Sequence, residues 1–199
     1  MPFTIPNCLT YFRIIAIPLI IIAYYSGMEY SNWYAAILFA LAGISDALDG
    51  YLARKWNQTS KLGAFLDPVA DKLLVAIMLL LIVSNVDVLS NLMSSWAFSI
   101  AVMIIIGREI TVSALREWMA EIGKRANVAV SNIGKFKTGI QMTAIGFLLF
   151  REDFIGIPML RFGEVLLYIA GVLTVWSMII YLSAAYRAVK EDFLLQIVF

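Results

Sequence analysis

Apolar stretches of about 20 residues fill most of this chain, and each is long enough to cross the hydrocarbon core of a membrane as a helix. With 62% hydrophobic residues and a mean hydropathy of +0.86, the composition is far more apolar than that of a soluble globular protein. Six stretches fit the chain, near residues 8–27, 32–54, 62–85, 94–121, 134–150 and 163–188. The sequence therefore predicts an all-α integral membrane protein with six transmembrane helices.

No part of the chain reads as a separate soluble domain or as a fixed-period repeat, so we expect one membrane domain over residues 1–199. The N-terminus lacks the small-residue cleavage site of a secretory signal peptide. We expect residues 1 to about 6 to form a short interfacial segment instead. The fourth stretch is apolar from Trp96 to Ile106 and then amphipathic, so its helix is expected to continue beyond the bilayer.

Basic residues are distributed unevenly between the two sides of this arrangement. If the N-terminus is cytoplasmic, all of the 15 lysines and arginines except Arg151 and Arg161 fall on that side. Such an imbalance predicts that both termini face the cytoplasm. The formal net charge is only +1, which gives no global attraction to nucleic acid, and we expect no nucleic-acid partner.

Four aspartates interrupt two of the apolar stretches, where an unpaired carboxylate would be costly. Asp46 and Asp49 are three residues apart, and Asp67 and Asp71 are four apart, so each pair shares one face of a helix. The short connection between the two stretches sets these helix ends side by side on the predicted cytoplasmic side. A cluster of four carboxylates at this depth requires cations.

The composition narrows the choice of cation. The chain has no histidine and one cysteine, Cys8, which excludes histidine-dependent triads, thiolate zinc sites and an intrachain disulfide. Two divalent cations, Mg²⁺ or Mn²⁺, suit a set of carboxylate oxygens best. Such a pair is the usual device for in-line displacement at phosphorus. A fourth carboxylate that the metals do not fully use, Asp71, is a candidate general base.

Small and basic residues beside the aspartates match this chemistry. Gly50, Ala53 and Gly63 would leave space for a bulky group near the helix backbones. Arg54 is placed to contact a diphosphate oxygen, although together with Lys55 it is equally typical of a topological stop at the end of a membrane helix.

The string D-A-L-D-G-Y-L-A-R, followed after eight residues by G-A-F-L-D-P-V-A-D, resembles the signature of the CDP-alcohol phosphotransferase family, with every position present. The resemblance implies a six-helix membrane enzyme, commonly a homodimer, that transfers a phosphatidyl-type group from a CDP-activated donor to an alcohol and releases CMP. It also implies that Asp46, Asp49 and Asp67 hold both metals and that Asp71 is a metal ligand and the base. The residues implied to bind the CDP part are Asp49, Gly50, Ala53, Arg54 and Gly63.

The acceptor alcohol should be recognised outside the shared string. Basic side chains gather within residues 107–138, and a phosphorylated acceptor needs such cations, whereas serine or choline does not. Lysines and arginines next to a membrane span are also expected for topological reasons alone. The candidates for the acceptor phosphate are Arg108, Arg116, Lys135 and Lys137.

Further strings, I-P-N-C-L-T-Y-F-R, A-L-R-E-W-M-A-E-I-G-K-R and G-K-F-K-T, resemble bacterial members of the family that use glycerol 3-phosphate, over roughly residues 3–142. This resemblance implies CDP-diacylglycerol as donor, glycerol 3-phosphate as acceptor, membrane lipids as surroundings, and Asn7, Thr10 and Arg13 as a lid over the nucleotide end. Asn7 is equally suited to cap the first helix.

Two other interpretations stay open. The same fold and donor would also serve inositol phosphate or phosphatidylglycerol as acceptor, because both are anionic. A divalent-cation transporter would also carry carboxylates in apolar helices, but transporter sites lie near the bilayer midplane between repeated halves.

Overall fold

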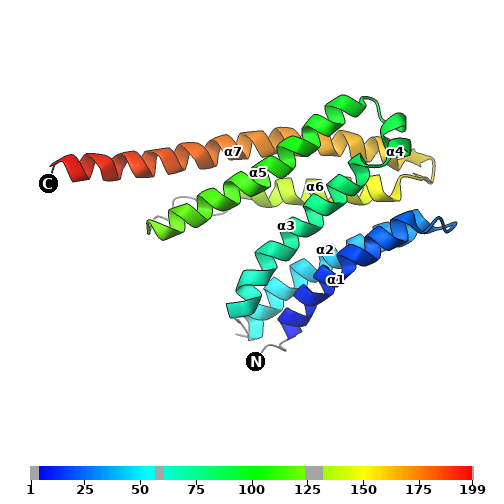
Figure 1. Cartoon of the computed structure of the whole chain (residues 1–199), viewed down its shortest axis with the longest axis horizontal. Helices are drawn as coiled ribbons and strands as arrows, with labels where there is room; N and C mark the ends of the chain where they lie inside the picture. The colour runs from blue at the N-terminus through cyan, green and yellow to red at the C-terminus, as the bar shows by residue number, and fades with distance from the viewer. Residues whose placement is uncertain (1–4, 57–60, 124–131, 199) are drawn as a thin grey trace. The chain divides into compact units, whose positions relative to one another are not determined.

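The computed structural model describes residues 5–56, 61–123 and 132–198, which form seven helices and one short hairpin (Figure 1). The elements in chain order are α1 (Ile5–Tyr25), α2 (Ser31–Trp56), α3 (Lys61–Val83), α4 (Val86–Asn91), α5 (Ser95–Glu121), α6 (Asn132–Phe150), β1 (Asp153–Phe154), β2 (Ile157–Pro158) and α7 (Met159–Val198). Each of the six apolar stretches corresponds to one long helix. The predicted all-α class is therefore confirmed for the described residues, apart from the two-residue strands of the hairpin.

Two short elements lie between the six predicted stretches, the helix α4 and the hairpin of β1 and β2. The segment after α3 forms the short helix α4, because the Asn85 side chain caps it by accepting a hydrogen bond from the Val88 backbone nitrogen at 3.1 Å. The turn at Gly156 joins two antiparallel strands. Ile155 and Gly156 both have positive φ, 52° and 76°, as the tight turns of two-residue hairpins require.

Four helices are long and apolar enough to cross a membrane, judged by length and composition within the described residues. They are Asn7–Tyr25, Ser31–Leu52, Ser95–Glu121 and Met159–Lys190. Helix α3 is of similar length, but it carries three charged residues close together, Asp67, Asp71 and Lys72. The described apolar part of α6, Phe136–Phe150, is shorter. These helices fit a multi-pass membrane protein, while six crossings and the orientation of the termini remain predictions. Of the predicted interfacial segment, residues 1–4 lie outside the described part of the chain, and α1 begins at Ile5.

Large apolar side chains on these helices face outward. Ile22 in α1 is 65% exposed, Ile44 in α2 is 54% exposed and Val172 in α7 is 68% exposed. An apolar surface of this kind along several helices would be unfavourable in water but matches the hydrocarbon core of a bilayer.

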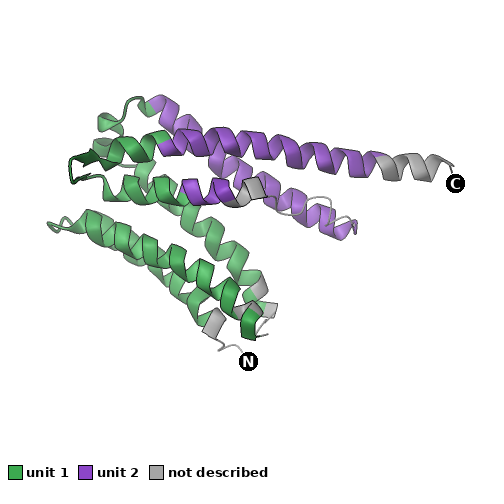
Figure 2. Cartoon of the chain, turned by 180° about the vertical axis from the view of Figure 1, so that it is seen from behind, with its two compact units in different colours: residues 1–95, 142–165 green, residues 96–141, 166–199 purple. Residues whose placement is uncertain are grey.

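The chain packs as two compact units, coloured separately in Figure 2. Unit 1 comprises residues 1–95 and 142–165, and unit 2 comprises residues 96–141 and 166–199. The boundary between the units falls within α6 and within α7, so each of these helices belongs partly to unit 1 and partly to unit 2. The single membrane domain over residues 1–199 stays a prediction.

In unit 1, α1 packs against α2 and α3. The face that α1 buries carries Ala16 and Ile20, both fully buried, and the face that α2 buries carries Ala35 and Ala42, likewise fully buried. Alanine at these positions allows two helix backbones to approach closely, which is typical of membrane-helix packing. The same two faces continue to two buried charged residues, Arg13 on α1 and Asp49 on α2.

The opposite end of unit 1 is held by a buried carboxylate. Glu164, near the start of α7, is fully buried and accepts hydrogen bonds from the backbone nitrogens of Met93 at 2.9 Å and Ser94 at 3.3 Å. These two residues immediately precede α5, so Glu164 supplies acceptors to N–H groups at a helix start. One residue earlier, Gly163 packs against α6 so closely that an added Cβ would lie 2.9 Å from Leu148 Cγ.

In unit 2, the described part of the core joins α5 to α7. Val112 and Met119 on α5 pack with Tyr181, Ala185 and Ala188 on α7. The spacing of these residues by three, four or seven positions places each set on one face of its helix.

Candidate active site

Arg13 lies between two of the four aspartates of the motif. Its guanidinium is 2.7 Å from a carboxylate oxygen of Asp46 and forms a shorter ion pair with Asp49. The Arg13 side chain is fully buried and that of Asp49 is 5% exposed, whereas that of Asp46 is 46% exposed. On α1, Arg13 lies one turn before Ala16 on the buried face. On α2, Asp49 lies two turns after Ala42 on the buried face. Packing of these two faces therefore forces the ion pair to form.

The third helix joins the cluster through a hydroxyl group. Thr10 is buried on α1, one turn before Arg13, and its Oγ1 donates a hydrogen bond to the carboxylate of Asp67 at 2.5 Å. Helix α1 thus contacts both halves of the aspartate motif, one on α2 and one on α3. The predicted convergence of the two helix ends includes α1 as a third partner.

The remaining candidates of the donor site lie on the same three helices. Asn7 is buried on α1 and Gly63 is buried on α3. Gly50 on α2 and Asp71 on α3 are partly exposed. Ala53 and Arg54 belong to α2, but their side chains fall outside the described part of the structure, so the predicted contact of Arg54 with a diphosphate stays a prediction.

The donor atoms of this cluster fit hard divalent cations. Asp46 and Asp49 converge on a single positive charge, that of Arg13, and every candidate ligand is a carboxylate oxygen. Among the described residues, no three acidic, histidine or cysteine side chains are close enough together to hold a metal ion. The predicted set of Asp46, Asp49, Asp67 and Asp71 as ligands of two cations therefore stays a prediction.

Unit 2 contains a second cluster of charged residues, centred on Glu109 of α5. Lys137 Nζ lies 2.6 Å from Glu109 Oε1, and Arg108 donates a hydrogen bond to the same oxygen at 2.8 Å. Arg108 is 8% exposed and Lys137 is fully buried. Arg108 also donates to the Ser177 hydroxyl at 3.3 Å and lies over the ring of Tyr181, with Cζ 5.9 Å from its centroid. Two buried cations share one carboxylate oxygen here.

Three buried polar atoms of unit 2 have no hydrogen-bond partner within the described part of the chain. They are Nε of Arg108, Oε1 of Gln141 and Oγ1 of Thr174. Most buried polar atoms in proteins are paired, so these three atoms are available to a polar ligand.

The structure brings only two of the four predicted acceptor-phosphate residues together. Arg108 and Lys137 are brought together, Arg116 is exposed on α5, and the side chain of Lys135 falls outside the described part. Reasoning from the sequence missed Glu109 as the link between two of these cations. Its position in the string G-R-E-I, next to a basic residue inside an apolar stretch, was the available signal.

Comparison with known proteins matches these features to one family. The model of the CDP-alcohol phosphatidyltransferase family matches residues 3–176. Proteins of Shigella flexneri serotype 5b (strain 8401) and Escherichia coli (strain K12), both named CDP-diacylglycerol–glycerol-3-phosphate 3-phosphatidyltransferase, are each 48% identical over 185 residues. The similarity covers 93% of this chain and 96% of each relative. Taken with the aspartate string, these matches establish that the chain belongs to the CDP-alcohol phosphatidyltransferase family.

Proposed function

We propose that this protein transfers the phosphatidyl group of CDP-diacylglycerol to glycerol 3-phosphate, which yields phosphatidylglycerophosphate and CMP. The observation that carries the proposal is the 48% identity, over 93% of the chain, to relatives named for this reaction. The two clusters described above supply chemistry of the kind each substrate needs.

The donor belongs at the aspartate cluster of unit 1. Asp46, Asp49, Asp67 and Asp71 bind two divalent cations, Mg²⁺ or Mn²⁺, which neutralise phosphate charge and stabilise the attacking and leaving oxygens when bound. Gly50, Ala53 and Gly63 leave room for the CDP part, and Arg54 contacts its diphosphate. Asn7, Thr10 and Arg13 cover the nucleotide end. Arg13 is supported in this role by its buried Nε, which has no acceptor in the described part of the chain.

The reaction is a displacement at the phosphorus that carries diacylglycerol. Asp71 accepts the proton of the primary hydroxyl of glycerol 3-phosphate, and the hydroxyl oxygen forms a new bond to this phosphorus. The bond from the same phosphorus to the CMP oxygen breaks, and CMP leaves with the electron pair. Fixed positive charge near the leaving phosphate lowers the barrier most when it is buried, because a low dielectric strengthens the interaction.

The acceptor phosphate is assigned to the cations of unit 2. Arg108 and Lys137 are two buried cations that contact one carboxylate oxygen, and side chains of this kind bind phosphate oxygens well. The unpaired Nε of Arg108 suits a phosphate oxygen, and the unpaired oxygens of Gln141 and Thr174 suit the hydroxyl groups of a glycerol. Serine and choline carry no phosphate for these cations to bind. Arg116 and Lys135 remain proposed contributors to this phosphate site.

The membrane arrangement proposed for this reaction has six crossings, both termini in the cytoplasm and the aspartate cluster at the cytoplasmic face of a bacterial membrane. The excess of basic residues on that side supports this orientation. Both substrates then meet the enzyme from where they occur, the donor from the bilayer and the acceptor from the cytoplasm. We also propose that the enzyme works as a homodimer within a single domain of residues 1–199.

An acceptor panel tests the proposal. The full-length protein in detergent micelles is given labelled CDP-diacylglycerol and Mg²⁺ with glycerol 3-phosphate, inositol phosphate, phosphatidylglycerol or serine, and both CMP and lipid product are measured. We expect CMP release and a labelled lipid only with glycerol 3-phosphate. A product with one of the other acceptors would replace the proposed substrate while keeping the fold and donor. Absence of CMP release with every acceptor would reject the transferase reaction.

A further inference from the structure

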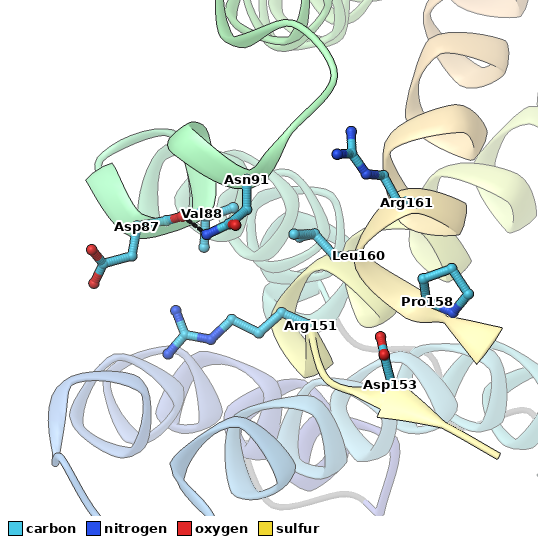
Figure 3. Close-up of a pocket in the computed structure, with 8 residues that line it drawn as sticks. All are labelled: Asp87, Val88, Asn91, Arg151, Asp153, Pro158, Leu160 and Arg161. Carbon is cyan, nitrogen blue, oxygen red and sulfur yellow. Dashed lines mark hydrogen bonds between the residues drawn. The ribbon is translucent and has the colours of Figure 1, made fainter. Parts of the chain in front are cut away.

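A polar cavity lies at one end of unit 1, away from the aspartate cluster. It has a volume of about 450 Å³, in the range of cavities that bind small ligands. The charged and amide side chains that line it are Asp87, Asn91, Arg151, Asp153 and Arg161. In Figure 3 these residues come from α4, the end of α6, the hairpin and the start of α7.

The cavity and the aspartate motif lie at opposite ends of the same helices. Arg151 Nε donates a hydrogen bond to Asn32 Oδ1 at 2.8 Å, and Asn32 is the second residue of α2. Asp49 lies 17 residues further along α2, which corresponds to a rise of about 25 Å. That distance is close to the thickness of the hydrocarbon core, roughly 30 Å. If the aspartates lie at one membrane interface, the cavity lies at the other.

Aromatic and apolar side chains support an interfacial position for this end. Tyr25 and Tyr30, between α1 and α2, are 59% and 53% exposed, as in the aromatic belts of membrane proteins. Val86, next to the cavity-lining Asp87, is 76% exposed, and Ile155 at the tip of the hairpin is 85% exposed. These apolar side chains are suited to contact lipid beside the polar cavity.

Arg151 is held firmly beside the cavity, whereas Arg161 is held weakly. The guanidinium of Arg151 lies over the ring of Tyr24, with Cζ 5.1 Å from the centroid, and its bond to Asn32 uses Nε. Arg161 is held only weakly, 3.7 Å from Glu164, and its side chain is 46% exposed. In Figure 3 the side chains of Arg151 and Arg161 extend on either side of Leu160. The terminal nitrogens of a guanidinium are well suited to bind phosphate oxygens.

The charges that line the cavity are balanced, with two arginines and two aspartates. A purely anionic ligand would be repelled by Asp87 and Asp153, and a purely cationic one would be repelled by Arg151 and Arg161. A ligand that carries both a phosphate and an ammonium group is complementary to the charges of both signs that line the cavity. An ammonium with N–H donors is favoured over a quaternary one, because the aspartates accept hydrogen bonds.

We propose that this cavity binds the headgroup of a zwitterionic membrane phospholipid, an aminophospholipid with a primary ammonium group such as phosphatidylethanolamine. Arg161 contacts its phosphate and Asp153 contacts its ammonium, and Arg151 and Asp87 line the rest of the cavity. The site is separate from the proposed catalytic chemistry and does not depend on which acceptor the enzyme uses.

Native mass spectrometry of the full-length protein tests this site. The protein is released from detergent micelles after incubation with equal amounts of phosphatidylethanolamine, phosphatidylcholine and phosphatidylglycerol of the same acyl composition. We expect preferential retention of phosphatidylethanolamine. Arg161→Gln should lower its retention about tenfold, the effect of losing one charge-assisted hydrogen bond. Asp153→Asn should lower retention of phosphatidylethanolamine but not of phosphatidylglycerol.

Two controls keep the result interpretable. Arg187→Gln changes an exposed arginine of α7 outside the cavity and should leave all three lipids unaffected. Thermal unfolding of each variant checks that it is folded, and Asp153, exposed on the hairpin, provides a test that does not disturb a helix. Equal retention of the three lipids by the unmodified protein, or unchanged retention in folded Arg161→Gln and Asp153→Asn, would overturn the proposal.

Discussion

Lys137 and Glu109 form an ion pair in which Nζ lies 2.6 Å from Oε1 and the lysine side chain is 1% exposed. A buried ammonium loses its hydration, so its charge acts strongly on any anion that enters beside it. Arg108 contacts the same carboxylate oxygen. This arrangement fixes the position of two cations with one carboxylate.

Lys137→Gln should weaken the binding of glycerol 3-phosphate more than that of CDP-diacylglycerol. We expect the KM for the acceptor to rise about tenfold or more, since a charge-assisted contact to phosphate contributes roughly 1.5–3 kcal/mol. Steady-state kinetics with each substrate varied in turn measures the effect. Arg187→Gln, at an exposed position of α7, is the matched control and should leave both KM values unchanged. An equal rise for both substrates would contradict the acceptor assignment.

Asp67→Asn should abolish CMP release while the fold is kept. The amide oxygen can still accept the hydrogen bond of Thr10, so packing between α1 and α3 is retained. The lost negative charge removes a proposed metal ligand, and we expect activity to fall by roughly three orders of magnitude, or about 4 kcal/mol in the barrier. CMP release and thermal unfolding are measured on the same preparation. Turnover near that of the unmodified protein would reject the proposed role of Asp67.

Arg13→Ala should destabilise the protein because it leaves the carboxylate of Asp49 buried without its cation. Breaking a buried ion pair in this way typically costs about 3–5 kcal/mol. Thermal unfolding in micelles measures the loss, and the double variant Arg13→Ala with Asp49→Asn should recover part of it.

The same variant also tests metal binding without an activity assay. If divalent cations bind these carboxylates, Mg²⁺ should raise the Tm of Arg13→Ala relative to a sample with chelator, since a ligand that binds only the folded state stabilises it. No dependence of the Tm on Mg²⁺ in this variant would count against a metal site at Asp46 and Asp49.

Gly163→Ala should lower stability through a steric conflict between α6 and α7 in unit 1. The added Cβ would lie 2.9 Å from Leu148 Cγ and 3.1 Å from the carbonyl oxygen of Ala144. Overpacking of this kind costs about 1–3 kcal/mol, which outweighs the gain in helix propensity. Gly107→Ala on α5 is the matched control, because nothing lies within 4 Å of its added Cβ. The control should be neutral or slightly stabilising, and a similar Tm for both variants would contradict the packing argument.

The proposed orientation can be tested through Cys8, the only cysteine of the chain, which is exposed near the start of α1. A membrane-impermeant maleimide should label it in inverted vesicles but not in intact cells. The converse pattern is expected for Ile155→Cys in a Cys8→Ser background, because Ile155 lies at the hairpin tip and is 85% exposed. Labelling of Cys8 from outside intact cells would reverse the proposed orientation.

The helices could be predicted from the sequence because apolar runs of membrane length leave few alternatives to a helix. The helix α4 was missed, since six residues capped by Asn85 give too weak a periodic signal. Glu164 was missed as well. Its partners, the backbone nitrogens of Met93 and Ser94, are about 70 residues away in the chain, and sequence periodicity carries no information at that range.

The sequence by itself determined the class of protein, the family and the aspartate string, because membrane spans and metal-ligating side chains follow from residue type and short-range spacing. Only the tertiary structure decided which charges meet. Arg13 joins Asp46 and Asp49 because two buried helix faces pack together, and Glu109 joins Arg108 and Lys137 because α6 brings a lysine from 28 residues away. A charge in the low-dielectric interior needs a partner of opposite sign next to it. These partners come together only after the helices have packed.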